Sequence, residues 1–174
     1  MLPKPAMVSD PLYTTVVPPE WVDYNGHLRD AYYGLICSYA TDALMDQIGL
    51  DAAGRARSHG SLFTLESHIH YLHEVKLGAQ VQVQLQLLDF DAKRLHIFLS
   101  LLLPGRAEPV AVCEQMLLHV DVRGPRSAVL PADVLAQVQS IAAAQGALPV
   151  PSLVGRVMGL PFTIKARDAL HPNP

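Results

Sequence analysis

Residues 20–27 bring together side chains that could do chemistry at an acyl group. Asp23 lies between Trp21 and His27, a few residues before a predicted helix. A carboxylate at that place can attack a carbonyl carbon or activate water. The free backbone N–H groups and the dipole of a helix N-terminus favour the negative charge that then develops. An aspartate in a loop is more often a turn former or a cap, so spacing alone leaves both roles open.

The neighbours of Asp23 have functional and structural interpretations. His27 could bind a substrate or orient Asp23, or it could simply fix the loop. Asn25 precedes Gly26 and is first a turn signal, with a substrate contact as the second possibility. Aromatic rings beside carboxylates suit a quaternary ammonium group, because a ring face attracts a cation. The aromatic residues that bracket the loop are Trp21, Tyr24, Tyr32 and Tyr33. In the alternative interpretation Trp21 and Tyr33 belong to the core, and only Tyr24 or Tyr32 touches a ligand.

Two later segments carry charged residues on predicted strands. Glu66, His68 and His70 alternate along one of them. These are metal-ligand types, but they lack a tighter constellation, so we predict a polar sheet face or a site wall and no metal ion. Glu114 lies on a strand face that is otherwise apolar, where a carboxylate is costly unless it is paired. It either faces a cleft or has a partner such as histidine or arginine, and we favour the cleft because buried carboxylates concentrate at functional sites.

The periodicity of the apolar residues defines the elements that position these side chains. Apolar residues recur at three- and four-residue steps from 31 to 48, which predicts a helix with Asp30 as its N-cap and Gly49 after its last turn. Residues 51–60 are typical of a polar connection. Alternation predicts strands at 63–71, 81–87, 94–103 and 110–122, after a short strand at 12–17. One face of the 63–71 strand would carry Phe63, Leu65, Ser67, Ile69 and Tyr71. A second helix is predicted at 133–144.

This order of elements predicts a single α+β domain, with residues 1–11 and about 148–174 as arms or tails. The five strands should form an antiparallel sheet around one long central helix, with a C-terminal helix added. Such a sheet leaves an edge exposed. We therefore expect edge-to-edge pairing into a homodimer or a dimer of dimers.

Composition excludes several classes of function. The net charge of −3 and the pI near 6.2 give no basic face for nucleic acid. Cys37 and Cys113 each lie among apolar residues and are predicted to be reduced core thiols. The N-terminal residues lack the apolar stretch of a signal peptide, and no run approaches the ~20 apolar residues of a membrane span. We therefore expect a cytoplasmic protein with no membrane partner.

The loop from Trp21 to His27, followed by Tyr33 seven residues after Gly26, resembles the hydroxybenzoyl-CoA thioesterase branch of the hot-dog superfamily. The resemblance covers most of the chain and implies a hot-dog fold and acyl-CoA thioesterase activity. In that branch the aspartate three residues before the glycine is the catalytic carboxylate, which implies this role for Asp23. It also implies that an N–H group near Asp30 polarises the thioester carbonyl. The expected catalytic residues are Asp23, His27 and Asp30, with nucleophilic and general-base roles of Asp23 left open.

A narrower resemblance links residues 22–27, 43–44, 92–96 and 114–121 to the betainyl-CoA thioesterases of carnitine breakdown. Residues 27–30 read His-Leu-Arg-Asp and depart from the commoner His-Val-Asn-Asn of the branch. Lys93 and Arg94 could bind the phosphates of CoA or form an ordinary solvated turn. The substrate-binding residues expected are Trp21, Tyr24, Asn25, Tyr33, Glu66, Lys93, Arg94 and Glu114. No cofactor is expected, because CoA is part of the acyl-CoA substrate. The alternatives are a non-catalytic acyl-CoA-binding protein and a hot-dog hydratase or dehydratase.

Overall fold

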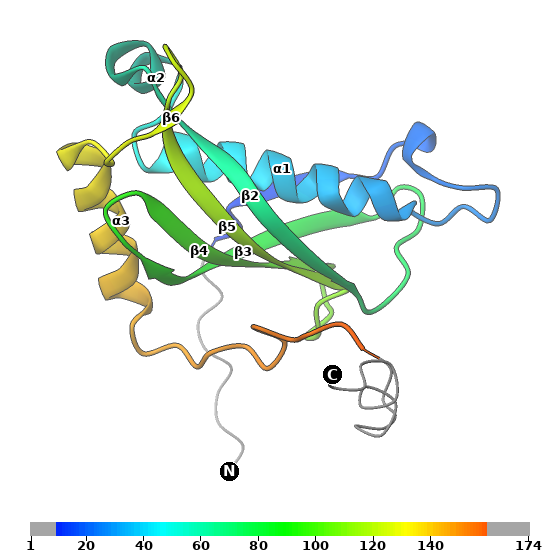
Figure 1. Cartoon of the computed structure of the whole chain (residues 1–174). Coiled ribbons are helices and arrows are strands. Elements are labelled where there is room, and N and C mark those ends of the chain that lie inside the picture. Colours follow the sequence, from blue (N-terminus) through cyan, green and yellow to red (C-terminus); the bar gives the residue numbers. More distant parts are fainter. Residues whose placement is uncertain (1–9, 160–174) are drawn as a thin grey trace, which may run out of the picture.

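The computed structural model describes residues 10–159, which form one antiparallel sheet wrapped around one long helix (Figure 1). The main path of the sheet has the strand order β1-β3-β4-β5-β2, and β6 pairs with β5. The elements in chain order are β1 (Tyr13–Val16), the 3-10 turn η1 (Pro19–Trp21), α1 (Asp30–Gln47), α2 (Ala52–Ser58), β2 (Gly60–Tyr71), β3 (Gln80–Phe90), β4 (Arg94–Leu102), β5 (Ala111–Asp121), β6 (Arg126–Ser127) and α3 (Ala132–Gln145). The predicted α+β hot-dog architecture is confirmed, with the short β6 added to the five predicted strands.

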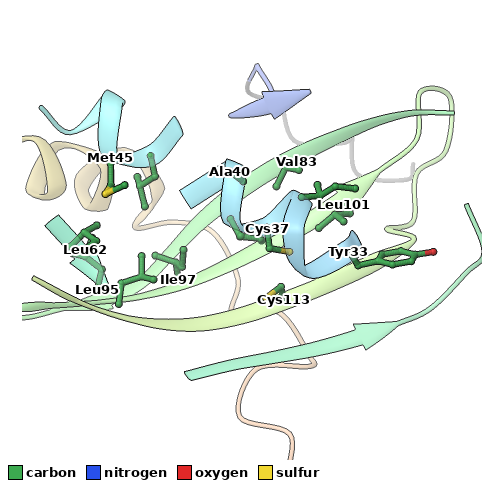
Figure 2. Close-up of a cluster of buried hydrophobic side chains, with 14 of the residues drawn as sticks. Tyr33, Cys37, Ala40, Met45, Leu62, Val83, Leu95, Ile97, Leu101 and Cys113 are labelled. Carbon is green, nitrogen blue, oxygen red and sulfur yellow. The ribbon is translucent and has the colours of Figure 1, made fainter. Parts of the chain in front are cut away.

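The core lies between α1 and the inner face of the sheet, as Figure 2 shows. Every apolar residue that defined the predicted helix is buried: Tyr33, Ile36, Cys37, Ala40, Leu44, Met45 and Ile48. The sheet contributes β-branched and leucine side chains from β3, β4 and β5, which suit a pleated, buried surface. Cys37 and Cys113 are free and buried, as predicted. Their mutual hydrogen bond and their burial raise the pKa of Cys37, which keeps it a thiol.

The segment predicted as a polar connection, residues 51–60, contains the helix α2, so that prediction was wrong. Asp51 caps this helix through a 2.7 Å hydrogen bond from the Gly54 N–H group. The helix is only two turns long and mostly exposed, so it shows no apolar periodicity. The N-terminal cap was its only clear sequence signal.

The strand predicted at 63–71 does not keep one side-chain alternation along its length. Its register against β5 shifts between Thr64 and Glu66, which marks a bulge at Leu65. Ser67 and Ile69 face α1, whereas Phe63 pairs with Leu118 and lies on the outer face of the sheet. The prediction that Phe63 shares a face with Ile69 was wrong, because one extra residue reverses the alternation.

The helix α3 and the following segment cover parts of the sheet that β1 leaves open. The side chain of Gln145 accepts a hydrogen bond from the Leu87 N–H group and donates one to the Leu85 carbonyl, and so continues the free edge of β3. Residues 146–159, called the arm here, then cross the outer face, where the Gly155 N–H group donates to Glu114 at 2.8 Å (Figure 1). The other residues of the two predicted tails, 1–9 and 160–174, lie outside the described residues.

Candidate active site

The loop before α1 holds Asp23 in a fixed position. The Asp23 N–H group donates to the His27 carbonyl at 2.9 Å. The Oδ1 atom of Asp23 accepts hydrogen bonds from the N–H groups of Asn25, at 2.8 Å, and His27, at 3.0 Å. Gly26 closes this turn with a φ of 75°, which few other residues tolerate. The two hydrogen bonds that the Asp23 carboxylate accepts from the loop both end on Oδ1, so Oδ2 is the oxygen left to face a ligand.

These hydrogen bonds also set the charge of Asp23. The N–H group of His27, followed by that of Asn25, lowers the pKa of Asp23 below the ordinary value of 3.8. The carboxylate is therefore ionised at neutral pH, as both a nucleophile and a general base require.

The start of α1 lies beside this loop and carries no side-chain cap. The N-cap residue is Arg29, and Asp30 is the first residue of the helix. The predicted role of Asp30 as the cap was wrong by one position. Arg29 instead ties the two segments together, because its Nε group donates to the Val22 carbonyl at 3.1 Å. The Tyr32 N–H group donates to the Arg29 carbonyl at 3.0 Å, whereas no side chain caps the N–H groups of Asp30 and Ala31, which can serve an anion or a developing oxyanion.

Asp23 and the first turn of α1 open into a cavity of about 400 Å³ (called the Asp23 cavity). Its other wall is the end of β2 and the residues after it. The lining includes three carboxylates, from Asp23, Asp30 and Glu74. His27 reaches across the cavity, with its Nε2 atom 3.3 Å from Glu74. The predicted catalytic residues Asp23, His27 and Asp30 are therefore brought together, as are Asn25 and Tyr33.

Two tyrosines supply the aromatic surface of the cavity. The rings of Tyr33 and Tyr71 meet edge to face, with centroids 5.3 Å apart. Tyr33 is buried and its hydroxyl group donates to the His73 carbonyl at 3.4 Å. Tyr71 keeps 53% of its surface exposed, so it is the ring that a ligand can touch. Burial raises the pKa of both hydroxyl groups, which therefore stay neutral donors.

Sequence reasoning missed the residues that β2 and its following loop contribute, Tyr71, His73 and Glu74. Other predicted aromatic residues lie elsewhere. Trp21 stacks on Tyr32 at 5.2 Å, outside the lining of the cavity, and Tyr24 is 94% exposed. Their substrate contacts stay predictions.

Glu66 and Glu114 lie in a second cavity, of about 480 Å³, on the outer face of the sheet beneath the arm. Glu114 is paired there. Its Oε1 atom lies 2.7 Å from His96 Nε2, and its Oε2 atom accepts from the Gly155 N–H group. The two alternatives left open by the sequence occur together, because Glu114 lines this cavity and His96 satisfies its carboxylate. Within one subunit neither glutamate joins Asp23.

Lys93 and Arg94 also lie away from the Asp23 cavity. Arg94 pairs with Asp91 at 2.6 Å and lowers the pKa of that carboxyl to about 2. It lines a shallow cavity of about 250 Å³ that shares His96 with the outer-face cavity. These contacts fit the turn-pair alternative, and a role in binding phosphates stays a prediction. Among residues 10–159, no three histidine, cysteine or acidic side chains lie close enough to hold a metal ion. In the same part of the chain, no helix is long and apolar enough to cross a membrane.

The antiparallel sheet wrapped around one central helix is the hot-dog fold. The Thioesterase-like superfamily matches residues 17–138, which is more than half of the chain. The chain belongs to this superfamily and is an acyl-CoA thioesterase.

Three similar proteins illustrate how specific the match is. A betainyl-CoA thioesterase of Pseudomonas aeruginosa is 62% identical over 86% of this chain and 94% of its own length. A proposed thioesterase from Pseudomonas putida KT2440 is 51% identical, with a TM-score of 0.80 over 90% of this chain and 100% of that one. A Staphylococcus aureus protein solved in complex with CoA is 30% identical, with a TM-score of 0.80 over 91% of this chain and 100% of that one. The fold and the enzyme class predicted from the sequence are confirmed.

Proposed function

We propose that the chain hydrolyses betainyl-CoA to betaine and free CoA, with Asp23 as the catalytic carboxylate. The observation that carries the proposal is the position of Asp23. Its ionised carboxylate, with Oδ2 free of loop contacts, lies at the mouth of a cavity that also holds the uncapped start of α1. A thioester carbonyl placed there has a carboxylate at its carbon and backbone N–H donors at its oxygen.

The reaction then needs few groups. The carbonyl oxygen accepts hydrogen bonds from the N–H groups near Asp30. Asp23 either attacks the carbonyl carbon through Oδ2, forming an anhydride that water later opens, or takes the proton of the water that attacks. In both routes the C–S bond breaks, and the CoA thiolate takes up a proton. A single turnover in isotopically labelled water separates them, because label found in Asp23 identifies the anhydride.

The lining of the Asp23 cavity supports a cationic acyl group. A trimethylammonium group has no N–H to donate, so it is recognised by ring faces and by through-space charge. Tyr71 offers an exposed ring, and Asp30 and Glu74 offer negative charge. In this proposal Asp30 and Glu74, rather than the predicted Glu66 and Glu114, supply the negative charge beside the acyl group. The 62% identity to a protein named betainyl-CoA thioesterase points to the same substrate.

The free edge of β2 supports a homodimer. This strand has twelve residues, and within residues 10–159 it pairs only with β5. Its exposed stretch carries Phe63 and Leu65, which are 46% and 57% exposed. A long, apolar, unpaired edge is a template for pairing with a second strand. We propose that two copies join antiparallel through β2, which places each Asp23 cavity next to the partner subunit, with a dimer of dimers as the larger assembly.

A thiol-release assay tests the activity. Betainyl-CoA is compared with its uncharged tert-butyl isostere, dimethylbutyryl-CoA, in the wild type and in Asp23→Asn. The amide is isosteric but neither attacks nor accepts a proton efficiently, so turnover should fall by more than tenfold while the fold is kept. A variant that keeps a tenth or more of wild-type turnover contradicts the role of Asp23. Equal kcat/KM for the two substrates in the wild type contradicts the preference for a cationic acyl group. It leaves the thioesterase activity standing.

The cytoplasmic location and the lack of a cofactor remain predictions of the sequence.

A further inference from the structure

Gly34 lies at the start of the second turn of α1, close to the Asp23 cavity. It directly follows Tyr33 and comes one turn after Asp30, and both of these residues line the cavity. A glycine inside a helix is destabilising relative to alanine, because its freer backbone must be ordered and it adds no side-chain contact. A glycine at this place therefore calls for a reason.

Neither backbone conformation nor packing requires a glycine at position 34. The glycines with a positive φ within residues 10–159 are others, and Gly34 is helical. In the same part of the chain, a Cβ atom on Gly34 would have one neighbour within 4 Å outside the helix backbone. This neighbour is the Cδ1 atom of Ile69 at 3.7 Å, an ordinary van der Waals contact. An alanine would therefore fit at this half-buried position and would favour the helix.

The surface over Gly34 continues the wall of the Asp23 cavity. β2 packs against this side of α1 (Figure 1), and Tyr71 is two residues after Ile69 on the same strand face. The Tyr71 hydroxyl group donates at 3.5 Å to the Asp30 carbonyl. In an α-helix that carbonyl also accepts from the N–H group four residues later, which is that of Gly34. The half-exposed ring of Tyr71 is therefore next to the backbone of Gly34.

A bound betainyl group would reach this surface. In the proposed site the thioester carbonyl lies at the N–H groups of Asp30 and Ala31, and one methylene group separates its carbon from the trimethylammonium nitrogen. The methyl groups are therefore within one helical turn, about 5.4 Å, of the carbonyl. One turn along α1 from Asp30 is Gly34. Three methyl groups on one atom form a wide end, which needs room beside the helix.

We propose that Gly34 is a specificity-determining residue that leaves room on α1 for an acyl group branched like a trimethylammonium or tert-butyl group. The wide end of the acyl group then lies between the backbone of Gly34 and the ring of Tyr71. This role rests on the proposed thioesterase function of the Asp23 cavity. It concerns the shape of the acyl group and is separate from the charge that Asp30 and Glu74 supply.

The variant that tests this role is Gly34→Ala, which adds one methyl group to the surface. Betainyl-CoA and dimethylbutyryl-CoA both carry a branched end, whereas the acyl group of acetyl-CoA is a single methyl group beside the carbonyl. We expect Gly34→Ala to lower kcat/KM by at least about tenfold for the two branched substrates, because an extra methyl group overfills the pocket. Acetyl-CoA should stay within about twofold of the wild type. Ser38→Ala, one turn further along α1 and exposed, is the matched control and should leave all three values within about twofold.

The melting temperature separates a role in substrate binding from a role in packing. Because alanine is the better helix former, Gly34→Ala should raise Tm by roughly 2–4 °C. Sedimentation should give the wild-type mass. A lower Tm or a changed mass would show that the glycine serves packing within or between subunits, and would overturn the proposal.

Binding to an inactive chain gives the same comparison without turnover. Calorimetry measures Kd for the three thioesters in Asp23→Asn, with and without Gly34→Ala. A rise in Kd for the two branched thioesters, with that of acetyl-CoA unchanged, supports the proposal. An equal change for all three thioesters, or no change, overturns it. Full activity of Asp23→Asn, or no hydrolysis of betainyl-CoA by the wild type, would instead overturn the proposed function.

Discussion

The aromatic surface of Tyr71 should account for a measurable part of the preference for a cationic acyl group. The proposed cation lies against this ring, because Tyr33 beside it is buried and Tyr71 is half exposed. A cation over a tyrosine face gains about 0.5–1 kcal/mol at an exposed site and about 2 kcal/mol when desolvated. For a half-exposed ring we take about 1 kcal/mol, which is about fivefold in kcat/KM.

The change that isolates this contribution is Tyr71→Leu, with Tyr71→Phe as the matched control. Phenylalanine keeps the ring but loses the hydroxyl group, which donates a long hydrogen bond of 3.5 Å to the Asp30 carbonyl. Leucine keeps apolar bulk but has no ring face. The measured quantity is the ratio of kcat/KM for betainyl-CoA to kcat/KM for dimethylbutyryl-CoA. A loss of activity that lowers kcat/KM equally for both substrates leaves this ratio unchanged.

We expect Tyr71→Phe to keep the wild-type ratio and Tyr71→Leu to lower it about fivefold. Sedimentation of both variants checks that the dimer is intact, since Tyr71 ends the β2 edge. An unchanged ratio in Tyr71→Leu would refute the contact between this ring and the cation. Charge recognition would then belong to Asp30 and Glu74 alone.

Three further predictions follow from contacts in and around the site. Because the pKa of Asp23 is lowered, the fall of kcat/KM at acid pH should have its midpoint below pH 3.8 in a pH–rate profile, wherever the enzyme remains folded, and a midpoint above that pH would contradict the role of Asp23. Gln115→Ala should lower the free energy of unfolding by about 2–4 kcal/mol, measured by urea denaturation, because it removes a buried hydrogen bond from Thr41 and leaves a cavity. Glu114→Gln should weaken the attachment of the arm and speed tryptic cleavage after Arg156, and an unchanged cleavage rate would contradict that anchoring role.

Much of the fold could be predicted because its main elements have strong periodicity. The apolar positions from 31 to 48 match α1 because this helix buries one face against a continuous sheet. The alternation of Val81 and Val83 with glutamines holds for the same reason, since β3 buries one face and exposes the other. Periodicity failed where no face is buried, as in α2, and where a bulge at Leu65 reversed it.

The site was predictable only where its residues lie close in sequence. Asp23, His27 and Asp30 belong to one loop and one helix start, so their spacing already brings them together. Tyr71 and Glu74 join them only because β2 crosses the sheet to pair with β5, which places its end beside the start of α1. No local sequence pattern predicts that β2 pairs with β5.

The same limit explains the two glutamates assigned to substrate binding. An alternating pattern shows that Glu114 shares a face with apolar residues and that Glu66 shares one with His68 and His70, but not which face of the sheet either one is. The side chain of Gln115, next along β5, points to Thr41 on α1, so Glu114 must point outward. Its partners, His96 and the arm, come from segments about 18 and 41 residues away. Their proximity depends on the strand order and on the path of the arm.

The start of α1 lacks a stabilising side-chain cap, and this leaves its N-terminal surface open to a ligand. A serine, aspartate or asparagine at the N-cap would add about 1 kcal/mol, but its side chain would occupy the N–H groups of the first turn. Arg29 stands there instead, and it fixes the chain by donating to the Val22 carbonyl outside the helix. Asp23 likewise uses Oδ1 to hold its own loop. Both residues thus stabilise the loop through groups that leave Oδ2 and the N–H groups of Asp30 and Ala31 without a side-chain partner, as a carboxylate and an oxyanion site acting on one thioester require.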